Sequence, residues 1–356
     1  MPSPLFLTNK ILKDKKIAKI LITGSTGFVG SHVLENLLNI KHQDIEIVAA
    51  CRDTSKLLPS YSGEVRVGDL RDPDYLDRVL VGIDVVCHTA GWSSFEKSGN
   101  TCNETYLEPT LDLINHAIEW RIKRFVNLSS LYVAKAKQRN NASSTGKPRA
   151  YWPMINCLIA IEDYLRTYTQ SQTQFVNLRL GLYSGKRLNM GLLPLLLARS
   201  GHSSMPYLTG PLGHLPLIDG KDIGQAFIRA AFAPIEASFS CLNICGPQTP
   251  THAEVMDFIK EHISHAPLKS GLPSFIASLV LSVQSQFKRF EQLPMLTPAM
   301  LDMLKSPLIS NQDAIQQLGF DPEISWQASL LNTLEIYKNQ SLNSILTEES
   351  KSLNIN

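Results

Sequence analysis

The sequence predicts a doubly wound α/β fold, in which helices cover both faces of a parallel sheet. Three observations support this prediction. Short apolar runs of strand length recur between residues 19 and 245, and segments with apolar residues at helical spacing lie between them. A glycine-rich turn joins the first apolar run to the first helical segment. Alternating strands and helices form a parallel sheet, and such sheets bind ligands at the carboxyl ends of their strands.

The glycine-rich turn follows the predicted strand at residues 19–23 and opens a predicted helix. It carries glycine at every third position. Gly24 permits the tight turn, Gly27 lets a pyrophosphate approach the backbone, and Gly30 lets the helix pack close to the strand. The N–H groups at the start of the helix then face the phosphates. A tight turn without a ligand is the alternative that this motif alone leaves open.

The other elements follow in chain order, and each strand is predicted from an apolar, β-favouring run. These runs are residues 46–51, 64–68, 84–89, 123–128, 174–180 and 240–245. The segments with helical spacing are residues 72–81, 105–121 and 153–170.

The organisation into domains follows from where this rhythm stops. We expect a dinucleotide-binding domain over residues 17–184, with residues 218–250 returning to it. Residues 185–217 are rich in Leu, Pro and Gly, and with residues 251–338 they are assigned to a smaller substrate lobe. Residues 339–356 are mostly polar and are predicted to be a disordered tail.

Composition restricts the class of protein. Apolar residues make up 44% of the chain and charged residues 19%, as in soluble globular proteins. The net charge of +2 gives no general attraction to nucleic acid or membrane.

The N-terminal segment lacks the apolar core of a secretory signal, so a cytoplasmic location is expected. Residues 275–283 are expected to form a core-facing helix, with peripheral membrane contact as the alternative.

The six cysteines form no C-x-x-C pair. Buried thiols in a reducing compartment are therefore expected. Cys241 and Cys245 share one face of a predicted strand, and we interpret them as core residues rather than as metal ligands. No metal site is predicted.

Several stretches together resemble one family. They are Thr23–Gly30, which matches a T-G-x-x-G-x-x-G turn, Gly68–Asp72, Cys87–Gly91, Leu128–Ser130, Pro216–Ala226, Leu242–Gly246 and Asn311–Pro322. On these residues the chain resembles an extended short-chain dehydrogenase/reductase of the NAD-dependent epimerase/dehydratase family, similar to dihydroflavonol reductases and 3β-hydroxysteroid dehydrogenases. The resemblance covers residues 17–338 and implies a Rossmann-type fold with a smaller C-terminal substrate lobe.

The resemblance also implies which residues bind the dinucleotide. They are Gly24, Ser25, Thr26, Gly27, Phe28, Val29, Gly30, Arg52, Asp69, Leu70, Thr89, Ala90 and Gly91. Arg52 stands where relatives that use NAD carry an acidic residue, and a guanidinium suits a 2′-phosphate. NADP is therefore the favoured cofactor. NAD is the alternative, because a register one residue later would give Asp53 the ribose-binding role.

The catalytic residues match this family only in part. Ser130 and Tyr151 stand at the positions of its catalytic serine and tyrosine, but Ile155 replaces the lysine four residues after the tyrosine. Tyr106 and Pro109 also replace a family asparagine and glycine. A phenol near pKa 10 is about one part in a thousand ionised at pH 7. Losing the lysine therefore threatens an acid–base contribution of roughly 10² to 10⁴ in rate.

Three alternatives to these assignments stay open. Lys147 or Arg149 would be the substitute cation, or both are solvated loop charges. Ser130 is either catalytic or a plain hydroxyl at the end of a strand. The protein either catalyses oxidation/reduction or epimerase/dehydratase chemistry on a hydroxyl or keto group of a sugar nucleotide or lipid-like small molecule, or binds the cofactor without catalysis, as a redox sensor or assembly partner. Homodimer formation is left open.

Overall fold

The computed structural model describes residues 18–40, 44–91, 99–134, 153–168, 171–188, 208–209, 213–262, 272–273 and 309–335. The chain divides into two compact units. The first unit comprises Met1–Gly181, Gly220–Cys245 and Ile309–Glu323, and the second comprises Leu182–Asp219, Gly246–Leu308 and Ile324–Asn356.

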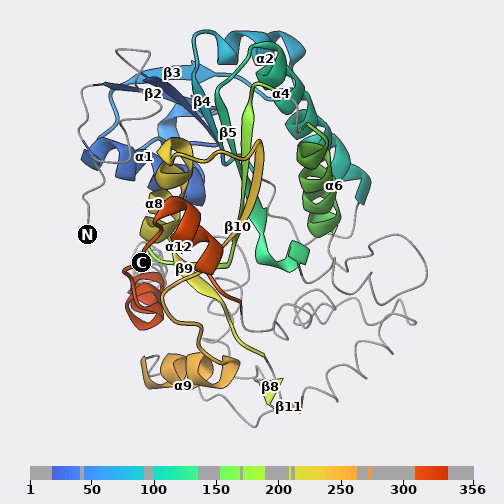
Figure 1. The fold of residues 1–356 in the computed structure, drawn as a ribbon. Coiled ribbons are helices and arrows are strands. Elements are labelled where there is room, and N and C mark those ends of the chain that lie inside the picture. The colour runs from blue at the N-terminus through green and yellow to red at the C-terminus, as the bar shows by residue number, and fades with distance from the viewer. Residues whose placement is uncertain are drawn as a thin grey trace, which may run out of the picture. The chain divides into compact units, whose positions relative to one another are not determined.

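The first unit contains a seven-stranded parallel sheet with the order β10-β6-β5-β4-β1-β2-β3 (Figure 1). Its strands are β1 (Ala18–Thr23), β2 (Ile45–Cys51), β3 (Glu64–Val67), β4 (Val85–His88), β5 (Arg124–Ser130), β6 (Gln174–Leu180) and β10 (Phe239–Ile244). The chain moves outward from β1 to β3 and then returns to place β4 on the other side of β1. This reversal is the switch point at which doubly wound sheets bind ligands. The predicted fold class is confirmed.

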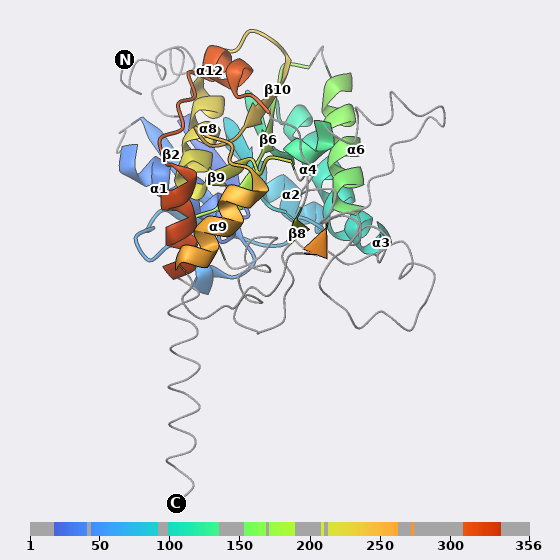
Figure 2. The same cartoon turned by 90° about the horizontal axis from the view of Figure 1, so that it is seen from below.

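Helices cover both faces of this sheet. They are α1 (Phe28–Ile40), α2 (Pro73–Leu80), α3 (Gly99–Cys102), α4 (Glu108–Glu119), α6 (Pro153–Thr167), α8 (Gly220–Phe232) and α12 (Gln312–Leu318). A short 3-10 helix, η3 (Thr54–Lys56), follows β2, and a π-helical turn, η4 (Asn103–Leu107), joins α3 to α4. Helices α1, α8 and α12 lie on one face, and α2, α4 and α6 lie on the other (Figures 1 and 2).

The core lies between the sheet and these helices. Because both faces of a parallel sheet are covered, its strands are mostly apolar rather than alternating. The residues without exposed area include Ile20, Leu21, Ile22, Val85, Val86, Phe125, Val126, Phe175 and Val176. Arg124 is a buried exception, since its Nη1 donates to the carbonyl oxygens of Ala230 (3.1 Å) and Ala233 (2.6 Å) at the end of α8. It therefore caps that helix from inside the sheet.

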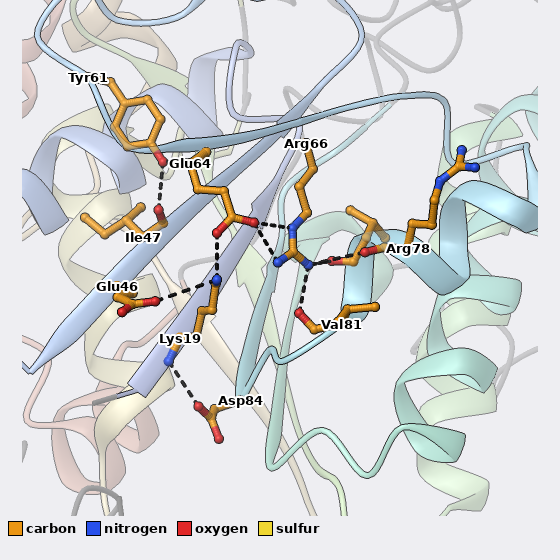
Figure 3. Close-up of polar contacts among 10 residues, drawn as sticks. Lys19, Glu46, Ile47, Tyr61, Glu64, Arg66, Arg78, Val81 and Asp84 are labelled. Atoms are coloured by element: carbon orange, nitrogen blue, oxygen red, sulfur yellow. Dashed lines mark hydrogen bonds and ion pairs between the residues drawn. The ribbon is translucent and has the colours of Figure 1, made fainter. Parts of the chain in front are cut away.

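An ion cluster joins the amino ends of the first three strands (Figure 3). The Lys19 ammonium on β1 lies 2.6 Å from the Glu64 carboxylate on β3 and 3.6 Å from that of Glu46 on β2. Arg66 pairs with the same Glu64 carboxylate (2.7 Å) and donates to carbonyl oxygens at the end of α2, including that of Val79 (2.8 Å). These contacts stabilise the sheet at the end opposite to the glycine-rich turn.

The second unit is described in shorter pieces. Its elements are β7 (Leu182–Ser184), β8 (Leu208–Thr209), β9 (Leu217–Asp219), α9 (His252–His262), β11 (Leu272–Pro273) and a helix over residues 326–335. β7 pairs with β9, and β8 pairs with β11, in two separate two-stranded sheets. Asp219 is buried in this unit, where its carboxylate accepts a hydrogen bond from the Ser329 hydroxyl (2.6 Å).

Two segments singled out from the sequence, 275–283 and 339–356, lie outside the described residues. Within the ranges given above, no helix has both the length and the apolar character needed to cross a membrane.

Candidate functional site

A cavity of about 440 Å³ lies at the carboxyl ends of β1, β2, β3 and β4. Nine residues that the family resemblance assigned to dinucleotide binding line it: Gly24, Thr26, Gly27, Arg52, Asp69, Leu70, Thr89, Ala90 and Gly91. They come from four separate stretches of sequence, so the parallel sheet brings them together. The cavity therefore lies at the place where the topology favours a ligand.

The turn between β1 and α1 forms one wall of the cavity. Gly24 has a left-handed backbone (φ 66°), and a Cβ atom there would lie 2.6 Å from the Cα atom of Ala90. A Cβ atom on Gly30 would collide with the Gly24 carbonyl oxygen and the Thr89 hydroxyl. Only glycine fits both positions. The turn is thus packed directly against the end of β4, and its backbone borders the cavity.

Four other residues assigned to the dinucleotide lie behind this wall and do not line the cavity. The Ser25 hydroxyl donates to the Ala50 carbonyl oxygen (3.1 Å), which joins the turn to β2. Val29 and Gly30 are buried in the first turn of α1, and the Phe28 ring packs edge-on against His32. These residues shape the start of α1, whose first N–H groups point out of the helix.

Arg52 and Asp53 directly follow β2, and their side chains have different surroundings. Arg52 is exposed and lines the cavity. The Asp53 carboxylate instead caps η3, because it accepts hydrogen bonds from the Ser55 N–H (3.0 Å) and hydroxyl (2.7 Å). It also lies 3.5 Å from the Lys56 ammonium. The Ser55 hydrogen bonds lower the pKa of the Asp53 carboxyl, so this group is ionised and engaged away from the cavity.

Asp69 and Arg71, which follow β3 and line the cavity, form an ion pair. The Arg71 guanidinium binds the Asp69 carboxylate through two bonds, Nε to Oδ1 at 3.0 Å and Nη2 to Oδ2 at 2.7 Å. The hydrogen bond from Arg71 lowers the pKa of Asp69 to about 2. The carboxylate is therefore ionised and fixed in orientation. The residue spacing Asp-x-Arg is the sequence signal for this pair, although Arg71 was not assigned a role from the sequence.

His88 was also missed by the sequence reasoning, and it is the buried polar centre of the site. Its Nδ1 lies 2.8 Å from the Thr23 hydroxyl on β1, and its Nε2 lies 3.2 Å from the Thr110 hydroxyl on α4. Burial lowers the pKa of His88 to about 4, so the ring is neutral at pH 7. A histidine inside an otherwise apolar strand is the signal that could have identified it.

The far end of the cavity is lined by η4 and the start of α4. Tyr106 and Pro109 both line it, and both are positions at which the sequence departs from the family pattern. Tyr106 is buried in the wall. The tyrosine and the proline therefore form part of the cavity lining, at positions where the family resemblance implies an asparagine and a glycine.

Of the two catalytic candidates, Ser130 falls within the described residues and Tyr151 does not. Ser130 ends β5 and does not line the cavity, and its hydroxyl accepts a hydrogen bond from the Tyr132 N–H (3.3 Å). Ile155, at the family's lysine position, is 4% exposed on α6. Tyr151, Lys147 and Arg149 lie outside the described residues.

Comparison with known proteins identifies the family. The model of the NAD-dependent epimerase/dehydratase family matches residues 20–245, which is more than half of the chain. The chain belongs to this family. The family resemblance inferred from the sequence motifs is thereby confirmed.

The curated relatives of this epimerase/dehydratase family member match over limited stretches. Uncharacterized protein 052L of Frog virus 3 is 28% identical over 123 residues, which are 33% of this chain and 34% of that protein. UDP-glucose 4-epimerase of Neisseria meningitidis serogroup B is 36% identical over 88 residues, 22% of this chain and 26% of the epimerase. The matches thus span about a third and about a quarter of these relatives.

Solved structures resemble the chain over nearly its whole length. The structure of MoeE5 in complex with UDP-glucuronic acid and NAD has a TM-score of 0.69 and 19% sequence identity, and the match covers 91% of this chain and 100% of MoeE5. At this identity the likeness supports the fold alone.

Proposed function

We propose that the cavity binds a nicotinamide dinucleotide through its adenosine-diphosphate half. The turn at Gly24 and Gly27 would hold the pyrophosphate, because its backbone borders the cavity and the positive end of α1 begins there. Asp69 and Leu70 would contact the adenine. The exposed backbone of Gly27, beside the tight turn at Gly24, carries this proposal, since both glycines line the cavity and no side chain there keeps a phosphate from the backbone N–H groups.

NADP is the proposed cofactor. Arg52 lines the cavity, and its guanidinium suits the 2′-phosphate, whereas the Asp53 carboxylate is engaged by Ser55 and Lys56. NAD, which the MoeE5 complex contains, is the alternative. It would require Asp53 to leave its cap on η3.

We propose hydroxyl or keto chemistry on a sugar nucleotide or lipid-like small molecule, by oxidation/reduction or by an epimerase/dehydratase reaction. The bound nicotinamide would supply a hydride acceptor or donor. Ser130 and Tyr151 would orient the reacting hydroxyl and exchange its proton. The names of the relatives favour a sugar nucleotide, since the meningococcal protein is a UDP-glucose 4-epimerase and MoeE5 was solved with UDP-glucuronic acid.

The second candidate is a member that binds the cofactor without catalysis, as a redox sensor or an assembly partner. The burial of Ile155 favours it, because an aliphatic side chain neither lowers the pKa of a neighbouring phenol nor holds a ribose hydroxyl. The Ser130 hydroxyl also has a structural partner in the Tyr132 N–H. Both features are those of a site in which proton transfer by a tyrosine would lack the lysine.

One set of measurements separates these functions. The full chain is titrated with NADPH and with NADH by fluorescence, and turnover is then measured with UDP-sugars and with hydroxy and keto lipids. Binding with turnover that disappears in Tyr151→Phe supports the enzyme, and binding without turnover supports the silent member. In the second case, activity created by Ile155→Lys would identify the lost lysine as the cause. Failure of both dinucleotides to bind would overturn the proposal.

A further inference from the structure

Two cysteines meet outside the cavity, at the contact between α3 and α6. Cys102 is the last residue of α3, and Cys157 lies in the first half of α6. Their Sγ atoms are 3.0 Å apart, although 55 positions separate them in the sequence. Cys102 has no exposed area, and Cys157 is 2% exposed.

The hydrogen bonds around the pair shift the pKa values of its two thiols in opposite directions. The Asn103 Oδ1 atom lies 3.5 Å from the Cys157 sulfur and accepts its thiol hydrogen bond. The hydrogen bond from Cys102 lowers the pKa of Cys157, whereas the same contact raises the pKa of Cys102. Cys157 is therefore the sulfur that ionises first, and Cys102 is positioned beside it as the second thiol.

The backbone next to Cys102 departs from regular α-helix geometry. The π-helical turn η4 begins at Asn103, directly after this cysteine. Such turns are wider than an α-helix and occur frequently at functional sites. A disulfide requires a sulfur–sulfur distance of about 2.05 Å, so the two sulfurs need to approach by about 1 Å. Rotation about the Cα–Cβ bonds of the two cysteines would supply a movement of that size.

We propose that Cys102 and Cys157 form a reversible disulfide when the protein meets hydrogen peroxide. The Cys157 thiolate attacks one peroxide oxygen and the O–O bond breaks, which gives a sulfenic acid and, after protonation, one water. The Cys102 sulfur then attacks the Cys157 sulfur, the S–O bond breaks, and a second water leaves. Two thiols lose two electrons, and one peroxide becomes two waters. An external dithiol reverses the reaction.

The disulfide would tie α3 to α6 on one face of the sheet. Its formation does not depend on the dinucleotide, so this proposal stands or fails separately from the proposed function. Cys157 is also two residues from Ile155, which places the bond on the helix that carries the family's lysine position.

The test uses the full chain without added cofactor. The reduced protein is treated with hydrogen peroxide, denatured, and alkylated, and its six cysteines are mapped by mass spectrometry without reduction. We expect the loss of two alkylated thiols and a cross-linked peptide pair that joins residues 102 and 157, both reversed by dithiothreitol. Full alkylation of Cys102 and Cys157 after treatment, or separate oxidation of each to a sulfinic acid, would overturn the proposal.

Variants check the assignment. Cys157→Ser and Cys102→Ser should each abolish the cross-link, whereas Cys87→Ser should keep it. Cys87 is a matched control because it is equally buried in the same unit, where burial raises its pKa to about 12. If a serine variant does not fold, the mapping of the wild-type chain decides the question alone.

Discussion

Glu162 on α6 and Arg179 on β6 form a buried ion pair. The Glu162 carboxylate has no exposed area and accepts two hydrogen bonds from the Arg179 guanidinium, at 2.6 Å and 2.9 Å. Asn177 adds a third hydrogen bond at 3.1 Å. A buried carboxylate needs such partners because its water has been removed. The pair therefore fastens α6 to the sheet at one defined position.

Removing the cation that pairs with the buried Glu162 carboxylate should destabilise the protein strongly. Arg179→Met is expected to lower the free energy of unfolding by about 3–5 kcal/mol, since it leaves the Glu162 charge without its main partner. Arg166→Met is the matched control, because Arg166 contacts the same carboxylate at 3.4 Å but its side chain is 55% exposed. Its cost should be about 1 kcal/mol or less. Urea denaturation measures both, and equal losses would contradict the buried role of Arg179.

Arg52 should determine the choice of dinucleotide. Arg52→Ala is expected to raise the dissociation constant of NADPH by about 10- to 100-fold, because a hydrogen bond to a charged group contributes about 1.5–3 kcal/mol. The constant for NADH should change little. Lys56→Ala is the control, since this lysine lies nearby on η3 but does not line the cavity. An equal loss for both dinucleotides in Arg52→Ala would argue against a 2′-phosphate contact.

Gly30 should be intolerant of any side chain. Gly30→Ala places a methyl group against the Gly24 carbonyl oxygen and the Thr89 hydroxyl, and overpacking of this kind costs about 1–3 kcal/mol. Gly91→Ala is the comparison, because the nearest atom to its added Cβ, the Thr89 carbonyl oxygen, is 4.0 Å away. Thermal unfolding of the two variants should show the loss in Gly30→Ala alone. Comparable melting temperatures would mean that the turn relaxes more than its packing suggests.

His88 should make the fold sensitive to mild acid. Its pKa is about 4 in the folded protein against a normal value of 6.5, so the unfolded chain takes up the proton first. Stability is therefore complete above pH 6.5 and is lost as the pH falls toward 4, by an amount on the order of 3 kcal/mol. His88→Gln should flatten the dependence of stability on pH between these values, whereas His116→Gln should retain it. An unchanged slope in His88→Gln would assign the acid sensitivity to another group.

The fold class could be predicted from the sequence because the patterns that indicate strands and helices are local. Each buried strand is an apolar run, and the rule of right-handed crossovers orders the strands once they are recognised. The cavity at Gly24 and Asp69 followed for the same reason, since strand ends meet at one edge of a parallel sheet.

Side-chain partners were harder to predict, because they depend on rotamers and on contacts distant in sequence. Asp53 has a carboxylate suited to a ribose, yet its nearest donors are on Ser55, two residues away. Cys102 and Cys157 lie on different helices, and nothing in their spacing indicates that they touch. The pairing of β9 with β7 in a separate sheet also has no local signal.

The order in which the chain supplies the sheet affects its biosynthesis. The outer strand β10 (Phe239–Ile244) pairs with β6 but follows it by 58 residues, so a ribosome exposes β6 before its neighbour has been made. Until then Phe175, Val176 and Leu178 present an apolar, unpaired edge of the kind that promotes aggregation. A fragment that stops at Gly181 would keep this edge permanently, so chaperone dependence and poor solubility of such truncations are the expected cost of an interrupted domain.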